Sequence, residues 1–177
     1  MKKRLGRLFF RIARIRAMGT FVGFMFTCCP FLIPIKKIRQ NKSAVSMKHP
    51  AASYPAHVLI IPRKIARTIF NLTPKDFMAI IEMTVEIRKE DDRDFSLIIN
   101  GGSRQDVMQA HFHLFTGNMA VEKALEGGKT FCPTDACFWE RITSNLRELL
   151  KENNLTEASF SLLIQFEKGF SPSLYFF

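Results

Sequence analysis

The first 75 residues contain no aspartate or glutamate, although they carry 16 lysines and arginines. Residues 76–177 carry 10 basic and 16 acidic residues, so the formal charge changes from +16 in the first part to −6 in the second. The net charge of +10 therefore does not describe a uniformly basic protein. It indicates a basic N-terminal arm attached to a mildly acidic domain.

Cysteine is scarce, and its spacing argues against a zinc site. Cys28 and Cys29 are adjacent, and four residues separate Cys132 from Cys137. A zinc knuckle needs two matched cysteine pairs, which this sequence lacks. We interpret the four cysteines as reduced thiols, a state that fits a cytoplasmic protein.

Charge is also absent from residues 17–35, a stretch long enough to span a bilayer. Two glycines and two prolines interrupt this stretch, and no clear small-x-small cleavage site follows it. We favour a segment that packs on the following domain. Insertion into a membrane as a signal anchor is the alternative.

Residues 1–16 interleave seven basic residues with apolar ones at helical spacing. The residues that would share one apolar face are Leu5, Leu8, Phe9, Ile12 and Ile15. This pattern is typical of a helix that lies on an anionic lipid surface, so we expect a cytoplasmic protein with a possible membrane association. The alternatives are packing on its own domain and, less favoured, contact with nucleic acid through the same charges.

Two histidines, His111 and His113, lie near the end of an alternating apolar run. Residues two apart in a strand point to the same face, so the two imidazoles would stand side by side. A rigid strand that presents such a pair suits metal binding or phosphoryl transfer through a nucleophilic histidine. Two half-buried histidines without a chemical role are the simplest alternative.

The residues upstream predict a hairpin that carries this pair. Residues 95–100 form an apolar run typical of a buried strand, and Gly101-Gly102 predicts a turn after it. A loop rich in amides and in backbone NH groups freed by glycine could surround phosphate oxygens. Further upstream, a strand over 58–61 and a helix from an N-cap at Thr73 to about Lys89 are predicted.

These elements follow one another in a specific order along the sequence. The order is Pro55-Ala56-His57, a strand, Pro62-Arg63-Lys64, a helix, Asn100-Gly101-Gly102 with Gln105, and Gln109-Ala110-His111-Phe112-His113. Over about residues 46–117 it resembles the histidine-triad (HIT) family of nucleotide hydrolases and transferases. The resemblance implies an α+β fold, in which an antiparallel sheet has flanking helices, and usually a dimer.

The same resemblance implies a reaction. A histidine would attack the α-phosphorus of a nucleoside phosphoramidate or a dinucleoside polyphosphate, and a nucleotidyl-histidine intermediate would form. The partner is then a small nucleotide, and the covalent step needs no metal or cofactor. The base, the leaving group and the acceptor are not specified by these residues.

Residue by residue, the resemblance places His111 on the nucleophile, with its tautomer held by the backbone carbonyl of Gln109. His113 would donate a hydrogen bond to a phosphate oxygen, and His57 would organise the nucleophile. The residues that would bind the substrate are Asn100, Gly101, Gly102, Gln105 and Gln109. No metal ligand is predicted.

Two positions depart from the family pattern. Gln109 stands where the first histidine of the triad is expected, and Asp106 stands where many members have serine or threonine. A carboxylate at Asp106 would repel a phosphate unless it were protonated or turned away. A catalytically weak or inactive nucleotide-binding scaffold is therefore the alternative function.

The last third of the sequence resembles a second copy of the same unit. Residues 160–165 resemble residues 95–100, and a helix over 135–153 would match the one over 73–89. In this register Ser173 replaces His111 and Tyr175 replaces His113. The copy would be inactive, and it could extend the sheet within one chain as an internal pseudo-dimer, with a homodimer as the alternative.

We thus expect three parts: a basic arm over 1–29, a HIT-like nucleotide-binding domain over 30–117, and a C-terminal α+β extension over 118–177. The sequence ends within an apolar run, at Phe176-Phe177, which would fit a truncated reading frame.

Overall fold

The computed structural model describes most of the chain. The described residues are 8–9, 11–15, 18–29, 32–33, 35–49, 57–89, 94–116, 129–131, 138–166 and 172–176. Cys132 and Cys137 lie outside them, as do the Pro55-Ala56 part of the motif and residues 90–93.

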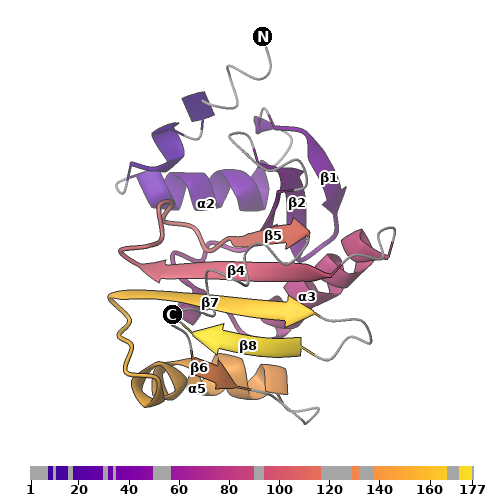
Figure 1. Cartoon of the computed structure of the whole chain (residues 1–177). Coiled ribbons are helices and arrows are strands. Elements are labelled where there is room, and N and C mark those ends of the chain that lie inside the picture. Colours follow the sequence, from indigo (N-terminus) through magenta and orange to yellow (C-terminus); the bar gives the residue numbers. More distant parts are fainter. Residues whose placement is uncertain are drawn as a thin grey trace.

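One antiparallel sheet of eight strands dominates the structure, in the order β1-β2-β3-β5-β4-β7-β8-β6 (Figure 1). The strands are β1 (Lys37–Gln40), β2 (Ala44–Lys48), β3 (Val58–Pro62), β4 (Phe95–Gly102), β5 (Phe112–Thr116), β6 (Lys129–Phe131), β7 (Ser159–Phe166) and β8 (Pro172–Phe176). The helical elements are α2 (Gly19–Cys28), η3 (Ile69–Asn71), α3 (Pro74–Arg88) and α5 (Phe138–Glu152). The predicted α+β class with an antiparallel sheet is confirmed.

Helix α3 begins where its capping residues predict. The hydroxyl of Thr73 accepts a hydrogen bond from the backbone amide of Asp76, and the Asp76 carboxylate accepts one from the Thr73 amide at 2.8 Å. Pro74 occupies the first helical position, where its missing NH leaves no bond unmade. These contacts are local in sequence, which is why the sequence pattern located this helix end correctly.

The two faces of β3 belong to different hydrophobic clusters. Val58 and Ile60 pack with α3 and α5, whereas Leu59 and Ile61 pack with Val22 and Phe26 of α2. Successive strand residues point to opposite faces, so α2 and α3 cover opposite sides of the sheet. The uncharged stretch over 17–35 thus packs on the domain along α2, as favoured.

Gly101 and Gly102 end β4 and also begin the predicted turn, because their carbonyls accept from the backbone amides of Arg104 and Gln105. Both lie within β4, because β7 extends the ladder past them: Gly101 is opposite Phe160, and Gly102 is opposite Ser159. A methyl group on Gly101 would overlap the ring of Phe160, so only glycine leaves room for that ring at this position. Gly102 is a central residue of the turn from Gly101 to Arg104, and its φ of 61° lies in the left-handed region that glycine favours.

The second unit repeats the topology of the first. In chain order β3-α3-β4-β5 is followed by β6-α5-β7-β8, and the sheet order β3-β5-β4-β7-β8-β6 places the two sets symmetrically about β4 and β7 (Figure 1). Ile80 of α3 and Leu146 of α5 belong to the same hydrophobic cluster, so both helices cover the same face. Strand directions and helix placement agree with the predicted repeat.

The register of the strands is symmetric as well. In the alignment of the two units, Phe95 corresponds to Phe160 and Gly101 corresponds to Phe166. Across the β4–β7 pair, Phe95 lies opposite Phe166 and Gly101 lies opposite Phe160, so exchanging the two units leaves the pairing unchanged. His113 lies opposite Ile98, whereas Tyr175 lies opposite Leu163, the residue equated with Ile98. Tyr175 therefore holds the register position of His113, while the two units share one sheet and one core.

The apolar face predicted for the N-terminal arm is only partly buried. Phe9 and Ala13 pack on the cluster beneath α2, whereas Leu8 and Ile15 are 55% and 54% exposed. Phe9 and Ala13 are four residues apart, a spacing that puts both on the same side of a helix. Within the described residues, no helix combines the length and the apolar character that crossing a bilayer requires.

Candidate active site

Strand alternation brings the four histidines of the chain to one face of the sheet. Phe112 and Leu114 point into the cluster with α3, so His111 and His113 point to the opposite side, toward α2. His57 continues the alternation of Leu59 and Ile61 to the same side. His49 follows Met47 of β2 there as well, and its backbone amide donates to the carbonyl of His57 at 3.1 Å.

His111 is held in one orientation by its own loop. Its Nδ1 lies 2.8 Å from the backbone carbonyl of Gln109, and the side chain is 7% exposed. A carbonyl only accepts, so Nδ1 of His111 carries the proton and donates it. In the neutral ring the lone pair then resides on Nε2, which is the atom that could act as a nucleophile.

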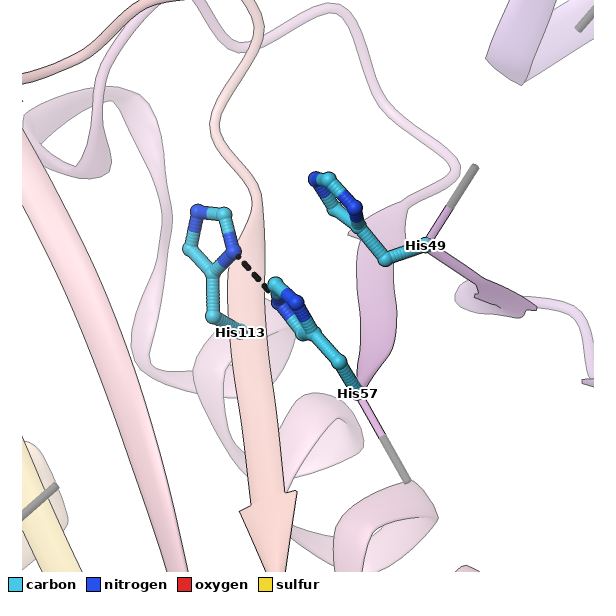
Figure 2. A group of neighbouring side chains, drawn as sticks. All are labelled: His49, His57 and His113. Carbon is cyan, nitrogen blue, oxygen red and sulfur yellow. Dashed lines mark hydrogen bonds between the residues drawn. The ribbon is translucent and has the colours of Figure 1, made fainter. Parts of the chain in front are cut away.

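His57 and His113 form a hydrogen bond, and His49 stands beside them (Figure 2). Nε2 of His57 and Nδ1 of His113 are 2.9 Å apart. Burial, reinforced by the charges of the neighbouring histidines, lowers the pKa of His57 to about 4 and that of His113 to about 2. Both imidazoles are therefore neutral near pH 7, and one donates to the other.

His49 adds a third imidazole that sequence reasoning did not include in the site. Its ring stacks on that of His57 with centroids 4.2 Å apart and an interplanar angle of 5°, and burial lowers its pKa as well. Among the described residues, His49, His57 and His113 place ring nitrogens within 4.8 Å of one another, a separation at which three imidazoles could bind one metal ion. Because imidazole ligates in its ring plane, the parallel rings of His49 and His57 do not converge on one point, and ligation would require one ring to rotate.

Asp106 points at the nucleophile candidate and is paired with the N-terminal arm. One carboxylate oxygen lies 3.5 Å from Nε2 of His111, and the other accepts from Nε and Nη2 of Arg14 at 3.0 Å. The hydrogen bond with His111, then the charges of His111 and Arg14, hold the pKa of Asp106 well below its ordinary value. Because a carboxylate only accepts, this hydrogen bond needs a proton on Nε2 of His111, and the lone pair of Nε2 becomes available to phosphorus once that proton has left. The carboxylate is neither protonated nor turned away from the site. Sequence reasoning missed Arg14, because nothing local indicates that the arm folds back over the domain.

Gln109 has a structural role in addition to its carbonyl contact. Its side-chain oxygen accepts from the amide of Ala66 at 3.2 Å, and its Nε2 donates to the carbonyl of Lys64 at 2.8 Å. Gly23 of α2 lies against it: a methyl group on Gly23 would come within 2.5 Å of the Gln109 oxygen. The residue that replaces the first histidine thus ties the loop after β3 to the loop of His111.

The other predicted polar residues are engaged within the protein. Nε2 of Gln105 donates to the carbonyls of Arg67 and Val107, at 2.5 and 2.7 Å. Asn100 accepts from the hydroxyl of Ser161 on β7 at 2.7 Å. Their roles toward a ligand, like those of Gly101 and Gly102 in the β4 ladder, stay predictions.

Little space is left between the arm and the sheet beside His111. The cavity there has a volume of about 10 Å³, room for at most one water molecule. Its wall consists of Phe9, Ala13, Phe26, Leu59, Ile61, Val107, Gln109 and His111. Cys28 and Cys29 are free thiols at the end of α2 and do not line this cavity.

The sequence matches a family model described as the HIT domain over residues 32–120. The chain belongs to the HIT family. No curated protein matches the sequence. This match covers the first unit, whereas the structural similarities below extend into the second.

The fold is similar to that of several solved structures. For a yeast Ap4A phosphorylase in complex with AMP the TM-score is 0.53 at 10% identity, over 88% of this chain and 63% of that one. For a DUF4931 family protein from Bacillus cereus the TM-score is 0.57 at 12% identity, over 80% and 83%. For a hypothetical protein from Leishmania major it is 0.50 at 16% identity, over 77% and 99%. This chain therefore spans less than two thirds of the phosphorylase, and the likeness concerns the fold.

Proposed function

We propose that this HIT protein is a nucleotide hydrolase or nucleotidyltransferase in which His111 attacks the α-phosphorus. The observation that carries the proposal is the 2.8 Å bond from Nδ1 of His111 to the Gln109 carbonyl, which makes Nε2 the nitrogen that presents a lone pair in the neutral ring. Family membership supports nucleotide processing, and a structural neighbour is a phosphorylase in complex with AMP. The substrate class is a nucleoside phosphoramidate or a dinucleoside polyphosphate.

The reaction takes place in two steps. Nε2 of His111 forms a bond to phosphorus, and the bond from phosphorus to the leaving group breaks, with its electron pair departing on that group. A water molecule or another acceptor then attacks phosphorus, the P–N bond breaks, and neutral His111 is restored. The proton of the attacking water goes to solvent.

The hydrogen bond between His57 and His113 supports a role for His113 on the phosphate. If Nε2 of His57 donates, Nδ1 of His113 accepts, and neutral His113 then carries its proton on Nε2. That proton can be donated to a phosphate oxygen, where it would stabilise the charge that develops in the transition state. Neutral rings at both positions favour this arrangement.

The covalent intermediate is the feature to test. Wild-type protein and His111→Ala are incubated briefly with adenosine 5′-phosphoramidate or diadenosine polyphosphates and quenched in alkali, which preserves a phosphohistidine bond. Intact mass spectrometry should find an adenylyl adduct on the wild type and none on His111→Ala. An equal adduct on both proteins would assign the chemistry to another residue.

A second candidate is a nucleotide-binding protein with little or no turnover. It is favoured by the Asp106 carboxylate 3.5 Å from Nε2 of His111 and by the narrow cavity beside that ring. Nucleotide binding measured by calorimetry, without an adduct and without loss of substrate, would select this candidate. Product formation that depends on His111 would exclude it.

We also propose that the N-terminal segment binds an anionic lipid surface. Of the eight exposed large apolar side chains among the described residues, six lie within residues 8–32. They accompany the basic, acid-free first part of the sequence. Co-sedimentation with phosphatidylserine vesicles, and none with neutral vesicles, is expected. Equal recovery with both would remove the electrostatic argument.

A further inference from the structure

Arg14 lies at the candidate active site although it belongs to the N-terminal arm. Its Nε and Nη2 both contact one oxygen of Asp106 at 3.0 Å, while the other oxygen of the same carboxylate lies 3.5 Å from Nε2 of His111. An anionic group thus occupies the space between a guanidinium and the nitrogen that is proposed to attack phosphorus.

We propose that Arg14 is a phosphate-binding residue of this site, and that Asp106 holds the phosphate position in the nucleotide-free protein. The inference rests on the proposed function. A phosphoryl group has the features that the carboxylate presents here, namely negative charge and several oxygens. A guanidinium fork recognises such oxygens well.

The arm is held firmly enough to position Arg14. Ala13, its neighbour, is 2% exposed and packs on the cluster of α2 and β3, and Phe9 meets Phe26 edge to face with centroids 6.2 Å apart. Backbone hydrogen bonds from Ile15 to Ile12 and from Met18 to Ile15 fix the chain around it. The guanidinium therefore projects from an ordered backbone rather than from a loose end.

The two basic residues that follow β3 are engaged elsewhere. Lys64 is paired with Asp76 at 2.8 Å, and Arg63 donates to the carbonyl of Asn41. In the part of the chain that the structure describes, Arg14 is the one lysine or arginine whose charge acts on the pKa of His49 or Asp106. Without Arg14, an incoming phosphate would meet the neutral imidazoles of His57 and His113 and the Asp106 carboxylate.

The pair of Arg14 and Asp106 is suited to exchange. The two side chains are 56% and 45% exposed, and half-exposed ion pairs are weak. A nucleotide phosphate can therefore replace the carboxylate on the guanidinium, after which Asp106 turns toward solvent. The position of Nε2 of His111 beside the displaced carboxylate places the phosphate next to the nucleophile.

The test compares each of the four ribonucleoside 5′-monophosphates with its nucleoside, by calorimetry. Arg14→Ala should weaken monophosphate binding on the order of tenfold to a hundredfold while leaving nucleoside binding unchanged. Arg14→Lys should lose less, since it keeps the charge but not the fork. Arg11→Ala, which removes a charge from an exposed position of the same arm, is the matched control and should bind like the wild type.

Asp106→Asn is a second test variant. Because it removes the negative charge that competes with the phosphate, it should bind the monophosphates more tightly than the wild type. Thermal melting of each variant verifies folding. If Arg14→Ala binds monophosphates as well as or better than the wild type, Arg14 is no phosphate ligand and the arm obstructs the site instead. If the wild type binds none of the monophosphates, the proposed function fails and this inference fails with it. If the wild type binds them and Arg14→Ala binds them with the same affinity, this inference alone fails.

Discussion

The side chain of Gln109 joins two backbone groups of the loop after β3: it accepts from the amide of Ala66 and donates to the carbonyl of Lys64. Gln109 is 1% exposed, so water cannot replace either bond. The neighbouring backbone adds a third link, from the amide of Ala110 to the carbonyl of Ala66 at 2.6 Å. The loop that orients His111 is therefore fixed to the loop after β3.

Replacing Gln109 with leucine should lower the free energy of unfolding by about 2–4 kcal/mol, because two buried backbone groups lose their partners. Urea denaturation measures this loss. Gln109→His is the matched variant, since a neutral imidazole also offers one donor and one acceptor, and it should lose less. Equal stability of the leucine variant and the wild type would show that the two bonds are dispensable.

Asp106→Ser should accelerate formation of the nucleotidyl adduct. The carboxylate stands 3.5 Å from Nε2 of His111, and its charge opposes an approaching phosphate. Removing one unit of like charge at this distance is expected to raise the rate about tenfold. Quenched-flow mass spectrometry gives the rate, with Asp94→Ser as a control outside the site. A slower Asp106→Ser would mean that the carboxylate assists the reaction.

The protein should lose stability as the pH falls from 6.5 toward 4. The pKa of His57 is lowered to about 4 in the folded protein, from an ordinary value of 6.5, and that of His113 is lowered further. In this window the unfolded chain binds protons that the folded protein does not, so each of the two histidines destabilises it on the order of 1 kcal/mol per pH unit.

Melting temperatures at pH 7, 6 and 5 test this dependence. His57→Phe removes one titrating group, and its melting temperature should depend less steeply on pH. Asp106 acts in a different window: its lowered pKa stabilises the fold above its ordinary value of 3.8, and this contribution is lost below that pH. A melting temperature that is constant from pH 7 to 5 would contradict the burial of neutral imidazoles.

Gly101→Ala should destabilise the fold by about 1–3 kcal/mol, because its methyl group would overlap the buried ring of Phe160. Chemical denaturation measures the loss. Combining Gly101→Ala with Phe160→Leu should cost less than the sum of the two single changes, since the smaller side chain admits the methyl group. Strict additivity would mean that the two residues do not share this space.

Much of the first unit was predictable from short-range patterns. Thr73, Pro74 and Asp76 located the start of α3, because a capping box involves residues three apart. Strand alternation placed His111 and His113 on one face, because the side-chain period of a strand is two. The contact of His111 with the Gln109 carbonyl also lies within three residues. Such features depend on local backbone geometry, which the residues themselves dictate.

The contacts that complete the site depend on how distant segments fold together. The sequence could not indicate that Gly101 and Gly102 belong to β4, since their pairing requires β7, or that Leu8 and Ile15 face away from the domain. The 3.0 Å contact of Arg14 with Asp106 joins residues that are 92 positions apart, and it exists because α2 and the arm cover the face of the sheet opposite α3. Several basic residues of the arm look alike in sequence, and long-range packing decided that Arg14 is the one that lies beside Asp106 and His111.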